Sequence, residues 1–333
     1  MSNVVLYRYD ASPFSKKIDH VLLLKNIPHQ KVNVASMLPR PEITDLLGVT
    51  YRRIPILAIG SDVYVDSSLI ASALERRFPA SKGYGTIFPN RKHGGDADTG
   101  LIKAFSKHWA DTVLFPLAPV LLPWEKFPPA FIQDRSTLGG PINPEAMTAS
   151  RGRSLSLLST HLSSVEEQLS DGREWLFDTE LPSLADVSVH FIYSWVNSKP
   201  FSGVESLFDP NTFPKALEWL SRLTAYLERL RQNQPAVLKI AGDKAAALIT
   251  SGAFEPYDVV GFDSREAERL GLKVGDQVSI SPDDTGRKFT TVGKLVALNR
   301  EEFVIEIKGA VGLVRCHFPR ILFTAKVTTK SKM

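Results

Sequence analysis

The opening of the chain constrains its fold more than any other stretch. The apolar run Val4 to Tyr7 is followed within a few residues by Ser12-Pro13, and then by an amphipathic segment that extends to Leu24. Serine is a favoured helix N-cap and proline a favoured first helical residue. The pattern therefore predicts a strand, a tight turn and a helix that begins at Pro13, with the Ser12 hydroxyl at the helix N-terminus.

Three later features follow this opening in a definite order. Ile54-Pro55 lies in an apolar run, Asp66-Ser67 precedes an apolar segment that ends near Phe78, and Ser183-Leu184-Ala185-Asp186 precedes another. An X-Pro bond takes the cis form at low cost, and acidic and hydroxyl residues favour helix N-termini. With these features in this order, the chain resembles the glutathione transferase superfamily, in its serine type.

The resemblance implies the architecture of roughly the first 240 residues. It implies an α/β thioredoxin-like domain at residues 1–82, which binds glutathione, and an all-helical domain at residues 96–245. Family members usually form dimers, so a homodimer is expected.

Beyond about residue 250 the apolar pattern changes from a period of 3.6 to a period of 2. This change predicts a third, small all-β domain at residues 252–329, shaped as a barrel or rolled sheet, and we assign it no role. It looks similar to an addition found in some fungal transferase-like proteins. Cys316 and His317 alternate across one of its strands, so they are not expected to share a metal. The predicted strands are Gln277–Ile280, Val292–Leu298, Phe303–Ile307, Val314–Phe318 and Leu322–Val327.

Composition excludes several classes of protein. The chain has 333 residues, enough for two or three domains, and its longest apolar runs are broken by prolines well short of the ~20 residues of a membrane span. A net charge of +4 without a basic run predicts no nucleic-acid partner. The single cysteine and the lack of a secretory pattern favour the cytoplasm. The alternative is the peroxisome, since Ser331-Lys332-Met333 is similar to a peroxisomal address.

Ser12 is the predicted catalytic residue. The thiol of glutathione has a reference pKa near 8.5, so activating it means stabilising its anion. A hydroxyl at a helix N-terminus can donate its proton to a thiolate while its lone pairs accept from the helix backbone. Ser15, Tyr7 and Tyr9 are alternative donors, and a helix cap without catalysis is the remaining interpretation of Ser12.

The resemblance implies how the tripeptide would be held, with no metal. Ile54-Pro55 would offer backbone groups to the peptide as an added strand. Asp66 would face the γ-glutamyl ammonium, Ser67 at the helix N-terminus its carboxylate, and Arg53 the glycyl carboxylate. The family usually has glutamate at the position of Asp66. We expect two further arginines, Arg40 and Arg52, to be solvated surface charges.

Aromatic and proline side chains are the predicted walls of a pocket for an apolar electrophile. The alternative for those in the proline-rich stretch from Phe115 to Pro144 is packing in a local minicore, because aromatic side chains are buried mostly for their area. The predicted pocket residues are Pro13, Phe14, Trp109, Trp124 and Phe127.

The predicted activity is glutathione transfer to an apolar electrophile, by conjugation or by glutathione-assisted isomerisation or elimination, in secondary metabolism or detoxification. The alternative is a non-catalytic ligand-binding or scaffold protein whose C-terminal β domain recruits a partner. Ser183 and Asp186 have a structural assignment: they form a capping box, and Asp186→Ala is expected to cost about 1–2 kcal/mol of stability.

Overall fold

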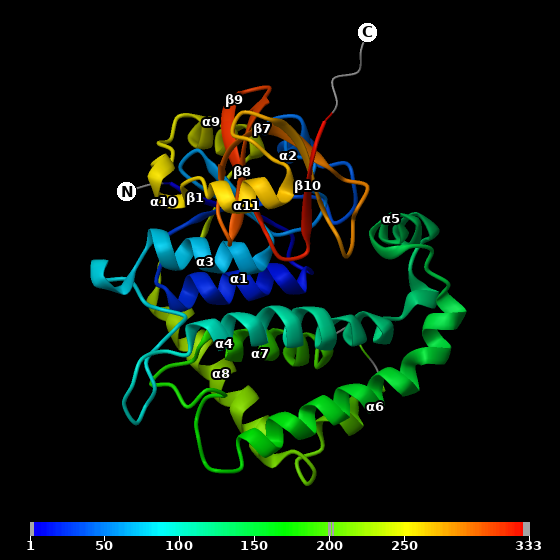
Figure 1. Cartoon of the computed structure of the whole chain (residues 1–333). Helices are drawn as coiled ribbons and strands as arrows, with labels where there is room; N and C mark the ends of the chain where they lie inside the picture. The colour runs from blue at the N-terminus through cyan, green and yellow to red at the C-terminus, as the bar shows by residue number, and fades with distance from the viewer. Residues whose placement is uncertain (1–2, 199–200, 202, 329–333) are drawn as a thin grey trace.

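The computed structural model describes residues 3–198, 201 and 203–328, so the tripeptide Ser331-Lys332-Met333 lies outside the described residues. Two helices, α1 (Pro13–Leu24) and α3 (Ser67–Arg77), run side by side beneath the sheet (Figure 1). Further helices lie on the other side of this pair. No helix among the described residues is long and apolar enough to cross a membrane.

The N-terminal part has the predicted thioredoxin-like order. The first strand pairs in parallel with the second and antiparallel with the third, which pairs antiparallel with the fourth. Ser12 caps α1, since its hydroxyl oxygen accepts from the backbone N–H of Ser15 at 3.2 Å. The strands are β1 (Val4–Arg8), β2 (Gln30–Asn33), β3 (Ile56–Ile59) and β4 (Asp62–Val65), and a short helix, α2 (Pro41–Thr44), follows β2.

The middle of the chain is helical, as predicted. The proline-rich stretch 115–144 is mostly helical, and most of its prolines stand at or beside the first positions of helices. Trp219, Phe191 and Tyr193 are at the centre of the core of this region. Its helical segments include α4 (Thr99–Ala104), a π-helical segment Phe105–Leu114, a 3-10 segment Phe115–Leu121, α5 (Pro129–Gly139), α6 (Pro144–Gln168), α7 (Leu184–Val196) and α8 (Pro214–Asn233).

The capping box at the start of α7 is present, and Asp186 does more than cap the helix. Its carboxylate accepts from the backbone N–H and the hydroxyl of Ser183, at 2.8 and 2.7 Å. It also accepts from the backbone N–H of Leu176 at 2.9 Å and from the indole N–H of Trp219 at 3.0 Å. Asp186 therefore joins α7 to α8 and to the segment before α7.

These two additional donors raise the expected effect of Asp186→Ala. The change leaves buried N–H groups of Leu176 and Trp219 without an acceptor, so the free energy of unfolding should fall by about 2–3 kcal/mol. Thermal denaturation measures the loss, and ligand binding should stay unchanged. Asp171→Ala, at an exposed carboxylate, is the control. An equal loss in both variants would contradict the assignment.

The five predicted C-terminal strands are all present, and they extend the N-terminal sheet. β9 pairs in parallel with β4, through Asp62 with Arg315 and Tyr64 with His317. The described residues thus form one ten-stranded sheet, ordered β10-β6-β7-β8-β9-β4-β3-β1-β2-β5. The elements added here are β5 (Leu238–Lys239), α9 (Gly242–Thr250), α10 (Tyr257–Val260), α11 (Ser264–Leu270), β6 (Gln277–Pro282), β7 (Thr291–Leu298), β8 (Glu302–Gly309), β9 (Gly312–Pro319) and β10 (Phe323–Val327).

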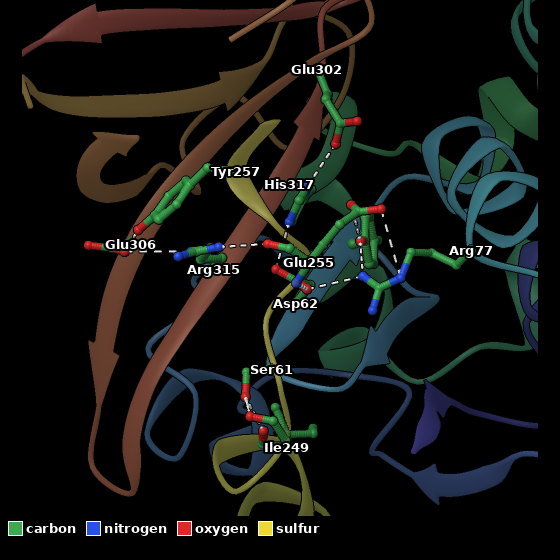
Figure 2. Close-up of polar contacts among 12 residues, drawn as sticks. Ser61, Asp62, Arg77, Ile249, Glu255, Tyr257, Glu302, Glu306, Arg315 and His317 are labelled. Carbon is green, nitrogen blue, oxygen red and sulfur yellow. Dashed lines mark hydrogen bonds and ion pairs between the residues drawn. The ribbon is translucent and has the colours of Figure 1, made fainter. Parts of the chain in front are cut away.

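The two faces of the sheet differ in chemistry where β9 pairs with β4. On one face, Cys316 joins a hydrophobic core that includes residues from both ends of the chain, such as Val63 and Ile305. On the other face, His317 lies buried between two carboxylates (Figure 2). Its Nδ1 is 2.7 Å from Glu302 and its Nε2 is 3.2 Å from Asp62.

Two arginines of α3 complete what we call the His317 cluster. Arg76 pairs with Glu302 at 2.8 Å, and Arg77 pairs with Asp62 at 3.1 Å. Burial alone would lower the pKa of His317, but its hydrogen bonds to Asp62 and Glu302 outweigh burial and raise it. The cluster therefore holds an imidazolium between one carboxylate from each end of the chain.

Candidate functional site

A cleft lies at the N-terminal ends of α1 and α3. It brings together all five residues predicted to bind the tripeptide, together with Phe14. The described residues that line it are Phe14, Tyr51, Arg53, Ile54, Pro55, Asp66, Ser67, Lys107, Asp111, Thr112 and Asp284.

The Ile54–Pro55 peptide bond, which is cis, lies immediately before β3. Both residues line the cleft. The backbone of this segment could pair with an extended peptide as an added strand.

Asp66 occupies the position between β4 and α3. Its backbone has a φ of 70°, and its carboxylate caps α3 by accepting from the backbone N–H of Ser68 at 3.0 Å. The same carboxylate lies 3.1 Å from the ammonium of Lys107 and 3.4 Å from the guanidinium of Arg53. Burial alone would raise the pKa of Asp66, but these two cations and the Ser68 hydrogen bonds outweigh it and hold the pKa well below its usual range.

Arg53 is the most heavily paired cation of the cleft. Its Nε donates to the hydroxyl of Tyr51 at 2.8 Å, and its Nη1 donates to both carboxylate oxygens of Asp284 at 2.8 and 2.9 Å. Burial would lower the pKa of Arg53, but Tyr51, Asp66 and Asp284 outweigh it and raise the pKa. The guanidinium stays charged at any working pH.

A second ion pair lies next to Ser67, with the Lys17 side chain 1% and the Asp111 side chain 6% exposed. The ammonium of Lys17 is 2.7 Å from a carboxylate oxygen of Asp111, and the Ser67 hydroxyl lies 3.4 Å from the other oxygen. Burial lowers the pKa of Lys17 and raises the pKa of Asp111. This pair ties α1 to the π-helical segment.

None of the four candidate thiol-activating residues is among the described residues that line the cleft. Ser12 is 3 % exposed, and the residue of the cleft lining nearest to it in the sequence is Phe14. The hydroxyls of Ser15 and Tyr7 are buried and have no hydrogen-bond partner within the described part of the chain. Burial, with Glu42 adding to it, raises the pKa of Tyr7. Tyr9 is half-buried, with the guanidinium of Arg40 over its ring at 5.8 Å.

Of the five residues predicted to form the pocket walls, Phe14 is among the described residues that line the cleft, and the other four are not. Phe14 lines the cleft and packs on Phe115 at 4.5 Å between ring centroids, and Pro13 precedes it at the start of α1. Trp124 packs on Phe127 at 5.6 Å in a local aromatic cluster. Trp109, half-buried on the π-helical segment, packs on Phe105 at 4.7 Å.

The expectation for Arg40 and Arg52 was wrong, because each is only 4 % exposed. Arg40 donates to the backbone carbonyls of Ala35 and Ser36, and Arg52 pairs with Asp134 of α5 at 2.7 Å. Backbone acceptors and a carboxylate partner compensate for the burial of both guanidinium groups.

Three charged residues of the cleft were missed. Lys107 and Asp111 are four residues apart in the sequence, a spacing that brings two side chains together on one face of a helix, so this pair of opposite charges was an available signal. Nothing in the sequence indicated that Asp284 belongs to the cleft, because it lies in a polar turn of the C-terminal region, to which the sequence assigns no function.

Two family models match parts of the chain. Residues 6–82 match the N-terminal domain of glutathione S-transferase, and residues 113–232 match a domain of unknown function, DUF7962. No curated protein matches the chain.

Among solved structures, the chain is similar to a GST-like protein from Pseudomonas syringae. The two share 25% sequence identity at a TM-score of 0.73, over 98% of this chain and 100% of that one. The beta-etherase LigF from Sphingobium sp. strain SYK-6 is 17% identical, with a TM-score of 0.51 over 70% of this chain and 100% of that one. The likeness to the Pseudomonas protein extends over the C-terminal strands, whereas the etherase shares the fold of a smaller part.

Proposed function

We propose that this chain, which belongs to the glutathione transferase superfamily, is a serine-type enzyme that binds glutathione in the cleft and presents its thiolate to an apolar electrophile. One observation carries the proposal: Arg53, Ile54, Pro55, Asp66 and Ser67, which lie in two separate stretches of sequence, line a single cleft. Phe14 is the apolar side chain of that lining closest in sequence to Ser12.

In the proposed complex, the peptide lies along Ile54-Pro55 as an added strand. The hydroxyl of Ser67 and the N-terminus of α3 receive the γ-glutamyl carboxylate, with the ammonium of Lys107 as an additional attraction. The cysteinyl sulfur then points toward the N-terminus of α1. This arrangement leaves the electrophile to approach from the side of Phe14.

Thiol activation in this proposal comes from the N-terminus of α1. Ser12 accepts from the backbone of Ser15, which leaves its own proton free to be donated to the sulfur. The helix dipole contributes about 0.3–1 kcal/mol and one hydrogen bond to an anion about 1.5–3 kcal/mol, against 1.36 kcal/mol for each pKa unit. Together they suffice to lower the thiol pKa by about one to three units.

The experiment that tests this function is the titration of enzyme-bound glutathione by its thiolate absorbance. The unaltered protein should bind glutathione and lower the thiol pKa by at least one unit from about 8.5. Ser12→Ala should return most of this shift, which reduces the thiolate fraction at neutral pH about tenfold. Binding should weaken only a few-fold, because the peptide contacts lie elsewhere.

Two variants separate thiol activation from helix capping. Ser12→Gly removes the hydroxyl but keeps a residue that is accepted at a helix N-cap. Ser12→Thr keeps the hydroxyl and the cap. The lowered thiol pKa should therefore be lost with glycine and kept with threonine. Ser15→Ala, Tyr7→Phe and Tyr9→Phe test the other donors. Bound glutathione with an unshifted thiol pKa would instead support the non-catalytic scaffold.

A further inference from the structure

The C-terminal region contributes one carboxylate to the cleft. Asp284 lies in the connection between β6 and β7, more than 200 residues after Arg53, yet both line the same cavity. Nη1 of Arg53 donates to both oxygens of Asp284, and the hydroxyl of Thr285 lies 3.5 Å from the same nitrogen. Asp284 thus binds Arg53 in the way that the carboxylate of a ligand would.

The connection that carries Asp284 is anchored on both sides. The backbone N–H of Gly286 donates to the carbonyl of Leu138 in α5 at 2.7 Å. The ring of Phe289 lies 5.6 Å from the guanidinium of Arg52, and the hydroxyl of Thr50 donates to the carbonyl of Thr290. These contacts hold Asp284 in place against Arg53.

The charges at this end of the cleft are consequently balanced. Arg53 faces two carboxylates, Asp66 at 3.4 Å and Asp284 at 2.8 Å, and Asp66 has Lys107 as a further partner at 3.1 Å. The side chain of Asp284 remains 33% exposed, so it faces arriving solutes. A ligand carboxylate directed at Arg53 would meet a like charge already bound to the same nitrogen.

We propose that Asp284 determines specificity at the Arg53 end of the cleft by occupying the cation that would otherwise bind the terminal carboxylate of a thiol peptide. This inference rests on the proposed function, because it assumes that a thiol peptide occupies the cleft. Thiols with a neutral group at this end are then accepted as readily as those with a carboxylate.

The test compares two probes, glutathione and its glycyl amide, by isothermal titration calorimetry. The unaltered protein should bind both with dissociation constants within about threefold of each other. In Asp284→Asn, Arg53 is released, so glutathione should bind about tenfold more tightly while the amide changes less than threefold. Asp284→Ala should behave in the same way.

Asp283→Asn is the matched control. It removes the same charge from the neighbouring residue, whose carboxylate accepts a hydrogen bond from Thr324 and not from Arg53. It should leave the ratio between the two probes unchanged, and a change equal to that of Asp284→Asn would reduce the effect to net charge and overturn the proposal. A tenfold preference for glutathione in the unaltered protein would also overturn it, without any variant.

Failure of the proposed function gives a different result. If neither probe binds the unaltered protein or Asp284→Asn, glutathione binding itself is excluded, and the inference is overturned with it. If both probes bind and their ratio is the same in both proteins, only the inference about Asp284 is overturned. Glutathione binding that appears only in Asp284→Asn supports the inference about Asp284 but contradicts glutathione as the ligand of the unaltered protein.

Discussion

Replacing Asp66 by alanine should lower the free energy of unfolding by about 3–5 kcal/mol and abolish measurable glutathione binding. The change leaves the ammonium of Lys107, which is 7% exposed, without its counter-charge, and removing one partner of a buried ion pair has an effect of this size. It also removes the cap of α3. Thermal denaturation should show a decrease in Tm on the order of 10 °C.

Matched variants separate these contributions. Asp66→Asn keeps a cap acceptor and tolerates the φ of 70°, so its loss of stability reports the charge alone. Combining it with Lys107→Met removes the unpaired cation, and the double variant should be more stable than Asp66→Asn. Additive losses would contradict the assignment of Lys107 as the principal partner. Asp66→Glu restores the charge and should recover most of the stability.

The second large effect is expected at His317. His317→Ala should lower the free energy of unfolding by about 3 kcal/mol, because it leaves two buried carboxylates, Asp62 and Glu302, with one arginine each. Chemical and thermal denaturation measure the loss. His93→Ala is the control, since that side chain is 79% exposed and its removal should change stability by less than about 0.5 kcal/mol.

The effect of His317→Ala should depend on pH in a definite direction. The folded-state pKa of His317 is raised above its ordinary value of 6.5, so its contribution is complete below that value and is lost as the pH rises through the folded pKa. Burial would raise the pKa of Asp62 and of Glu302, but hydrogen bonds to His317 outweigh it and lower both, so their contribution is lost in acid. The stability difference between the two proteins should therefore be largest at weakly acidic pH. A difference that grows toward alkaline pH would contradict the imidazolium.

Local signals predicted the N-terminal part well. Ser12-Pro13 and Asp66-Ser67 each determine a helix start by capping, which depends on a few neighbouring residues, and α1 and α3 begin at these positions. The alternation in the last 80 residues predicted five strands for the same reason, since each strand shows its own buried face. The capping box of Ser183 and Asp186 was likewise predicted from four consecutive residues, and it is present.

The contacts that join distant segments were not predictable in this way. The alternation of apolar residues along β9 predicts that Cys316 lies on a buried face. It does not predict which strand pairs with β9, because the pairing with β4 is decided by the packing of the whole sheet. The resemblance to the glutathione transferases implied a ligand carboxylate as the partner of Arg53, and it carried no information on the β6–β7 connection. Asp284 enters the cleft through the β6–β7 connection, so its role depends on the tertiary fold.

The pairing of β4 with β9 has a consequence for synthesis on the ribosome. Residues 62–64 receive their partners from residues 315–317, so this edge of the first sheet stays uncovered until nearly the whole chain has been translated. At 5–20 residues per second, the roughly 250 intervening residues take on the order of 10–50 seconds. Exposed strand edges promote intermolecular pairing, so nascent chains are expected to need chaperone protection during that interval.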